Sequence, residues 1–145
     1  MEEKAAFKNK INVFYVTIPS ENEDEHTFVN TINIEETEQI ANISFYTSFI
    51  NIDETSVFAK IRYAMTNNHN NAFSGFTEPF AINKIPNTVF TSFDVAVDFV
   101  LQSDTLACFE IQLLKKSANE NFEILDSKEC YAEIKLIEDV QNGKS

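Results

Sequence analysis

The chain has only two glycines, Gly75 and Gly143, in 145 residues. Loops that cradle phosphates need several closely spaced glycines, so the sequence excludes the P-loop and the dinucleotide-binding fingerprint. The scarcity also excludes Asn-Gly and Asp-Gly hairpin turns, except at Asn142-Gly143. The turns of this chain therefore have to be made by Asn, Asp, Ser and Pro.

Side chains that commonly carry out catalysis are also scarce. The chain has two histidines, His26 and His69, and two cysteines, Cys108 and Cys130. It contains no nucleophile elbow, HExxH motif, CxxC pair or kinase signature. A triad assembled from distant residues leaves no trace in a sequence, but two histidines without an activating motif favour a protein that is not an enzyme. We expect no cofactor.

Arginine occurs once, as Arg62, and the net charge is −12. Nucleic acids and anionic membranes attract basic surfaces, so this charge disfavours both as partners. Residues 1–8 lack the apolar stretch of a signal peptide, and no run reaches the roughly 20 apolar residues that span a bilayer. We therefore expect a soluble, cytoplasmic protein whose partner is another protein or a second copy. The acidic excess either maintains solubility or steers a basic partner.

What the chain does contain is a large apolar fraction, 43% of its residues, including 14 phenylalanines. A chain of this length buries a full core, and each buried aromatic ring removes roughly 150–250 Å² from water. We predict one β-domain over residues 11–137, preceded by an N-terminal segment over residues 1–10. A flexible polar tail over residues 138–145 follows it.

Apolar and polar residues alternate with a period of two over short stretches, which is typical of strands. The stretches are residues 11–18, 28–34, 43–50, 57–65, 76–82, 93–101, 107–113, 122–125 and 130–137. Pro79 limits the 76–82 stretch to a sheet edge, and a single helical turn over residues 35–41 is an open alternative. About eight or nine strands predict an all-β, antiparallel β-sandwich, immunoglobulin-like or jelly-roll-like, with a small barrel as the alternative.

Two neighbouring stretches, 93–101 and 107–113, carry their large apolar residues at odd positions. Opposed residues of a hairpin point to the same face of a sheet. We therefore predict that these stretches form a hairpin in which Phe99 pairs with Phe109.

The same register places Asp98 opposite Glu110 on the outer face. Opposed carboxylates repel, so the pair is a weak candidate for a cation site or for one carboxyl with a raised pKa. The alternatives are two solvated side chains, or a pair bridged by a lysine such as Lys135.

The two cysteines are predicted to face opposite sides of the sheet. Cys108 alternates with Glu110 on the outer side, whereas Cys130 alternates with Ala132 and Ile134 on the inner side. A disulfide needs both side chains on one face, so we predict free thiols, which suit a reducing compartment.

An asparagine-rich loop within residues 66–76 is the best local candidate for recognition. It offers polar side chains between two aromatic rings, on a loop held by a rigid sheet. The residues singled out are Asn67, Asn68, His69, Asn70, Asn71, Phe73 and Phe76. An ordinary long turn whose phenylalanines pack at the core edge is the alternative.

A second loop, residues 20–25, is strongly acidic. Glu23, Asp24 and Glu25 could bind a hard cation through oxygen ligands, as calcium sites do. The loop lacks the EF-hand pattern, and acidic runs are usually solvated, so these residues are weak candidates and we predict no metal site.

The absence of catalytic motifs together with abundant β structure predicts a non-catalytic protein-interaction module. Two alternatives stay open. One is a structural or assembly protein, phage-like in character, whose sheets pair between copies. The other is a sandwich that binds a small molecule or a cation.

Overall fold

The computed structural model describes residues 7–18, 27–53, 57–65, 75–83 and 88–137. Ten strands occur in this part of the chain. They are β1 (Lys10–Ile18), β2 (Thr27–Phe28), β3 (Thr31–Ile34), β4 (Glu38–Ile50), β5 (Val57–Met65), β6 (Gly75–Phe76), β7 (Phe80–Ala81), β8 (Phe90–Gln102), β9 (Thr105–Lys116) and β10 (Phe122–Leu136). None of the described residues forms a helix, so no helix among them could cross a membrane.

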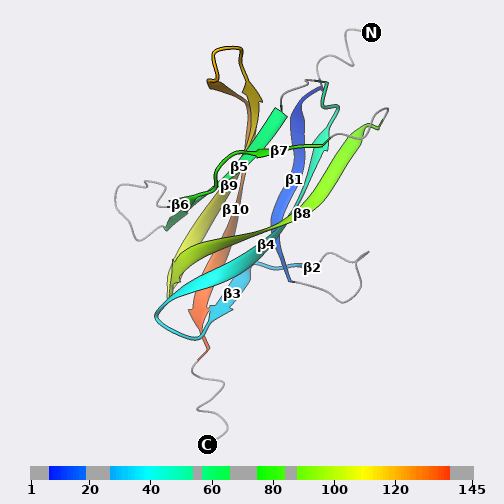
Figure 1. The fold of residues 1–145 in the computed structure, drawn as a ribbon. Helices are drawn as coiled ribbons and strands as arrows, with labels where there is room; N and C mark the ends of the chain where they lie inside the picture. The colour runs from blue at the N-terminus through cyan, green and yellow to red at the C-terminus, as the bar shows by residue number, and fades with distance from the viewer. Residues whose placement is uncertain (1–6, 19–26, 54–56, 66–74, 84–87, 138–145) are drawn as a thin grey trace, which may run out of the picture.

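The strands form two sheets that pack face to face. Sheet A has the order β2-β1-β4-β8, and sheet B has the order β3-β10-β9-β5-β6, with β7 also paired to β5. All neighbours are antiparallel except β3, which runs parallel to β10. The predicted two-sheet β-sandwich is confirmed, apart from this parallel pair. Figure 1 shows the hairpin between β9 and β10 projecting beyond the other strands, at the end where β1 begins.

The core is built from aromatic rings contributed by both sheets. Phe45 of β4 and Phe109 of β9 are fully buried, and their ring centroids lie 5.1 Å apart in an edge-on arrangement. Phe14 of β1 stacks on Phe45 from the same sheet at 5.1 Å. Edge-on and offset ring pairs add to the stabilisation that burial provides. The phenylalanines therefore join the two layers, as the composition suggested.

The predicted hairpin between residues 93–101 and 107–113 is wrong. β8 pairs with β4 in sheet A, whereas β9 pairs with β5 and β10 in sheet B, so the chain crosses from one layer to the other at Ser103-Asp104. Both strands still point their odd-numbered residues inward, since Phe99 and Phe109 meet in the core from opposite sheets, with centroids 5.9 Å apart.

Several strand boundaries also differ from the sequence pattern. Residues 28–34 contain the last residue of β2 and the whole of β3, which lie in different sheets. Residues 38–41 belong to β4, which excludes the alternative of a helical turn over 35–41. The two C-terminal stretches, predicted as separate, form one strand, β10, which has a bulge at Leu125.

The edge of sheet B along β5 is covered by the segment that carries β6 and β7. Both short strands pair with β5, and between them the Thr77 N–H donates to the carbonyl of Ile61 over 2.9 Å. Pro79 interrupts this covering segment, in agreement with the expected edge position. A side chain at Gly75 would place its Cβ 3.0 Å from the ring of Phe99, so the absence of a side chain lets β6 approach β8 closely.

Candidate functional site

The asparagine-rich candidate lies almost entirely outside the described residues. Asn67, Asn68, His69, Asn70, Asn71 and Phe73 belong to residues 66–74, which the structure does not describe. Phe76 is described: it lies in β6 with 63% of its surface exposed, and the Lys60 ammonium sits 4.6 Å from its ring centroid. Recognition by this loop stays a prediction.

The acidic candidates do not form one site. Glu23, Asp24 and Glu25 also lie outside the described residues. Asp98 and Glu110 are in different sheets, so their predicted opposition is wrong. Within the described ranges, no group of three or more acidic, histidine or cysteine side chains is arranged to hold a metal ion.

Each of those two carboxylates instead has a hydrogen-bond donor in its own sheet. Asp98 accepts a hydrogen bond from the Asn42 side chain over 2.8 Å. Glu110 accepts two from Arg62, with Nε and Nη2 at 2.8 and 2.6 Å from the same oxygen. The alternative bridge through Lys135 is also wrong, because the ion pair of Lys135 is with Glu133.

The cysteines are free and protonated. Cys130 packs against the core and Cys108 lies on the opposite side of sheet B, as predicted. Burial, followed by the charge of Glu129, raises the pKa of Cys108 to about 11. Burial raises the pKa of Cys130 to about 12. A nucleophilic cysteine needs a lowered pKa, so neither thiol has the environment of a catalytic group.

The most unusual feature of the described surface is the edge of sheet A formed by β8. This strand pairs with β4 over thirteen consecutive residues without a bulge. On its other side, no described strand pairs with it. Natural sheets usually shorten, bend or cover their edges, because an edge presents a row of backbone groups that can pair with another chain.

The backbone groups that β8 turns towards this edge follow from the register. Asn51 N–H donates to the Val89 carbonyl over 2.7 Å, and Ser103 N–H donates to the Thr37 carbonyl over 2.9 Å. These two bonds extend the register of the thirteen pairs between β4 and β8 by one position at each end. Backbone groups in a strand alternate in direction, so the odd-numbered residues of β8 bond to β4. The even-numbered residues that point the other way include Ser92, Ala96, Asp98 and Val100.

The inner face of β8 is only partly covered along its middle. Phe99 is 5% exposed, whereas Phe93, Val95 and Val97 are half-buried, because the strands opposite them are the short β6 and β7. A hollow of about 270 Å³ lies between β7 and the first half of β8, where Phe80, Phe93 and Val95 line it. Apolar side chains therefore border the open edge on its inner side.

A second hollow, of about 390 Å³, lies between β6 and the end of β8. Tyr63 is among its lining residues and is 2% exposed. The hydroxyl of Tyr63 is buried without a hydrogen-bond partner among the described residues, and burial raises its pKa to about 12. A buried donor without a partner is destabilising.

The outer face of sheet A carries aromatic and acidic side chains. Tyr15 of β1 lies 5.4 Å from Tyr46 of β4 and 5.5 Å from Phe28 of β2, measured between ring centroids. Burial, followed by the proximity of Tyr46 and Asp94, raises the pKa of Tyr15. Asp94 and Asp98, both exposed, stand on this face of β8.

The opposite side of the sandwich is partly covered, in contrast to β8. There β1 packs against β10 of the other sheet. The Asp126 carboxylate accepts a hydrogen bond from the backbone N–H of Ile11 over 2.8 Å, and Val29 N–H donates to the Val16 carbonyl over 3.0 Å. A side chain and a loop thus satisfy edge groups of β1.

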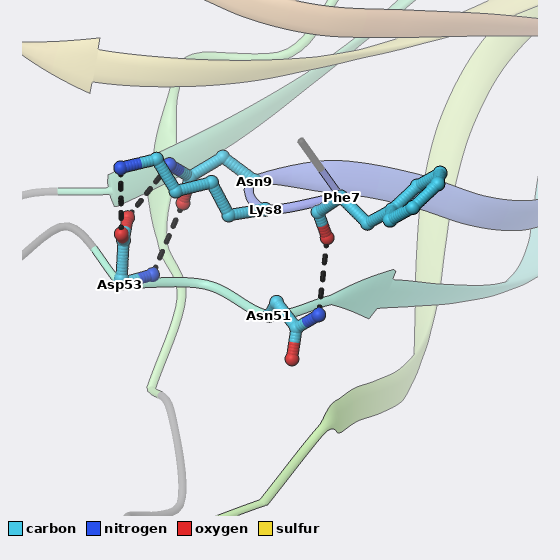
Figure 2. Close-up of polar contacts among 5 residues, drawn as sticks. All are labelled: Phe7, Lys8, Asn9, Asn51 and Asp53. Carbon is cyan, nitrogen blue, oxygen red and sulfur yellow. Dashed lines mark hydrogen bonds and ion pairs between the residues drawn. The ribbon is translucent and has the colours of Figure 1, made fainter. Parts of the chain in front are cut away.

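A polar cluster fixes the end of the sandwich at which β8 begins (Figure 2). Asp53 accepts a hydrogen bond from the Asn9 amide over 2.7 Å and forms an ion pair with Lys8 at 3.2 Å. These contacts, the Asn9 bond foremost, lower the pKa of Asp53. Asn51 donates to the Phe7 carbonyl over 3.1 Å and also bonds the residue before β8. The cluster holds the start of the strand in position.

Comparison of the chain with protein-family models, curated proteins and solved structures finds no match. Sequence reasoning located β8 and the inward direction of its odd residues, but missed its open edge. Alternation records which face of a strand is buried and carries no signal for which strand lies beside it.

Proposed function

We propose that this protein is a non-catalytic protein-interaction module that accepts an extended segment of its partner along the free edge of β8. The observation that carries the proposal is the length of that edge, thirteen residues without a bulge. Strand addition obtains affinity from main-chain hydrogen bonds and specificity from the side chains on either side of them. Both elements are available along β8.

The surroundings of β8 support the same function. Half-buried Val95 and Val97 offer an apolar inner face to alternate side chains of an added strand. A cytoplasmic site of action is part of this proposal, supported by the two free cysteines.

A set of short peptides tests the function on the full chain. Each peptide alternates valine with a polar residue, which is threonine, lysine or glutamate. Amide hydrogen exchange is then measured with and without each peptide. At least one peptide should slow exchange at Ala96, Asp98 and Val100, whereas Val95 and Val97 already bond to β4 and should change little. If no peptide protects the even-numbered amides, the proposed function is wrong.

A proline at the edge provides the blocking variant. Ala96→Pro removes an N–H that points away from β4, a position where a sheet edge tolerates proline. We expect this variant to lose peptide binding while its unfolding transition stays cooperative. Ala96→Thr, which retains the N–H and suits a strand, is the matched control and should bind as the natural chain does.

A structural role through self-assembly is the second candidate. Ile40 and Val100 are direct neighbours on the outer face of sheet A and are 70% and 49% exposed. Exposed apolar pairs of this kind favour contact between copies. Analytical ultracentrifugation tests the idea: a concentration-dependent dimer that Ile40→Ser abolishes would support it, and a monomer throughout would exclude it.

A further inference from the structure

The charges within the strands are distributed unevenly between the two sheets. In sheet A the strands contain one cation, Lys10, and three carboxylates. Those carboxylates are Glu38 of β4 and Asp94 and Asp98 of β8, and all three stand at even positions on the outer face. The other cations of the described strands lie in sheet B, where Arg62 pairs with Glu110 and Lys135 with Glu133. The open edge is therefore the acidic margin of the sandwich.

The spacing of the two aspartates gives this margin a specific pattern. Asp94 and Asp98 are four residues apart on one strand, a separation of roughly 13 Å, and both turn their side chains to the outer face. In an added antiparallel strand, the residues opposite them would also be four apart and on the same face. Opposite charges in directly opposed positions stabilise a sheet, so a lysine or arginine suits both positions.

The inner face of β8 determines which residues suit the positions between the two basic residues of the added strand. The residues opposite Val97 and Val95 would point inward, next to side chains that are half-buried in the free protein. Apolar residues there would cover them and gain the stabilisation of burial. Ala96 stands between the aspartates, and its small side chain restricts the opposing residue least.

A second copy of the chain fits this edge poorly. If two β8 strands paired antiparallel about Ala96, Asp94 of each copy would stand opposite Asp98 of the other. Directly opposed like charges destabilise a sheet. The net charge of −12 on each copy adds repulsion at longer range. The same charge would attract a basic segment of another protein.

We infer that the segment bound along β8 is a basic strand of a different protein. This strand has lysine or arginine at two positions four residues apart, and the first and last of the three residues between those positions are apolar. This inference rests on the proposed function and adds the chemistry of the partner. It assigns two roles to the aspartates, since charges on an edge strand also discourage self-pairing. Selection for a basic strand and rejection of a second copy follow from the same two side chains.

Three nine-residue peptides from the set test the pattern against the full chain. All carry valine at the fourth and sixth positions; the third and seventh positions are lysine in one, threonine in another and glutamate in the last. We expect the lysine peptide to bind about tenfold more tightly than the threonine peptide, and the glutamate peptide to bind most weakly. Added salt should reduce the advantage of lysine. Equal affinities with protection of β8 amides would overturn the charge inference and leave the proposed function standing.

A charge reversal on β8, with a matched reversal on the other sheet, separates local pairing from overall charge. Asp94→Lys with Asp98→Lys should lose the preference for the lysine peptide and bind the glutamate peptide about tenfold better than the natural chain does. Glu129→Lys with Glu133→Lys changes the net charge by the same amount. These exposed residues are also four apart on one strand, β10. This control should keep the preference for the lysine peptide. If both double variants lose it, the chain's overall field selects the peptide and the inference is wrong.

Sedimentation of the same proteins tests the identity of the partner. The natural chain should remain monomeric at the concentrations used for peptide binding. A dimer that Ala96→Pro dissociates would mean that a second copy occupies the edge, and this would overturn the assignment to a different protein.

Discussion

The two sheets end differently on the same side of the molecule. Beyond β5, sheet B ends in a covering segment that carries β6, Thr77 and β7 and is interrupted by Pro79. Sheet A ends at β8, a longer strand with no described strand beyond it. Covering segments and prolines are common ways to stop a sheet from recruiting further strands. The comparison shows that, among the described residues, one edge is covered by a further segment, whereas the adjacent edge along β8 has no neighbouring strand.

The anchoring of β8 to the covered sheet gives the largest expected effect. Phe99→Ala should lower the free energy of unfolding by about 3–5 kcal/mol, because Phe99 is 5% exposed and packs against Tyr63 and Phe109 of sheet B. Val97→Ala, at a half-buried position of the same strand, should cost about 1 kcal/mol. Chemical denaturation measures both. Equal losses would mean that the middle of β8 is as well covered as its end.

The second-largest effect is expected when a carboxylate of each sheet is replaced by its amide and the losses in the free energy of unfolding are compared. Glu110→Gln should cost about 1–2 kcal/mol, because the Glu110 side chain is 12% exposed and accepts two hydrogen bonds from Arg62. Asp98→Asn should cost at most about 0.5 kcal/mol, since Asp98 is exposed at the open edge. The measurement is again the free energy of unfolding. A larger loss at Asp98 would show that its charge serves the fold, which would weaken its assignment to recognition.

A smaller effect is expected from the orphan hydroxyl beside β8. Tyr63→Phe removes a buried donor without a described partner, so it should leave stability unchanged or raise it by up to about 1 kcal/mol. In Tyr131→Phe, the control, an exposed hydroxyl that bonds Glu129 is removed, and the change should be a slight loss. Thermal unfolding distinguishes the two signs. A marked loss for Tyr63→Phe would mean that its hydroxyl is satisfied within the fold.

The smallest effect concerns the polar cluster next to the start of β8. The pKa of Asp53 is lowered in the folded chain, so its charge adds stability that is fully present above the ordinary aspartate value near 4 and declines as the pH falls below it. The natural chain should therefore exceed Asp53→Asn in stability at pH 6, and the gap should narrow towards pH 3. Because the Asp53 side chain is 45% exposed, the difference should be small. A gap that is constant with pH would contradict the ionic contribution.

Much of the fold could be predicted from residue patterns, but the pairing of strands could not. The odd-numbered residues of β8 and β9 were correctly placed inside, and the same parity satisfies both a hairpin and two strands facing each other across the core. The short Ser103-Asp104 connection serves either arrangement. Asp98 and Glu110 were therefore assigned to one site, although they lie in separate sheets with Asn42 and Arg62 as their partners.

By itself, the sequence determined that this protein is an all-β sandwich with a phenylalanine-rich core, because burial of one strand face leaves a period of two in the residues. The tertiary structure decided which strands are neighbours, which edge stays open and which charges meet. Backbone hydrogen bonds between strands are made by groups that every residue except proline carries, so the alternation of residues does not record them. The site proposed along β8 depends on those bonds and is visible only once the sheets are assembled.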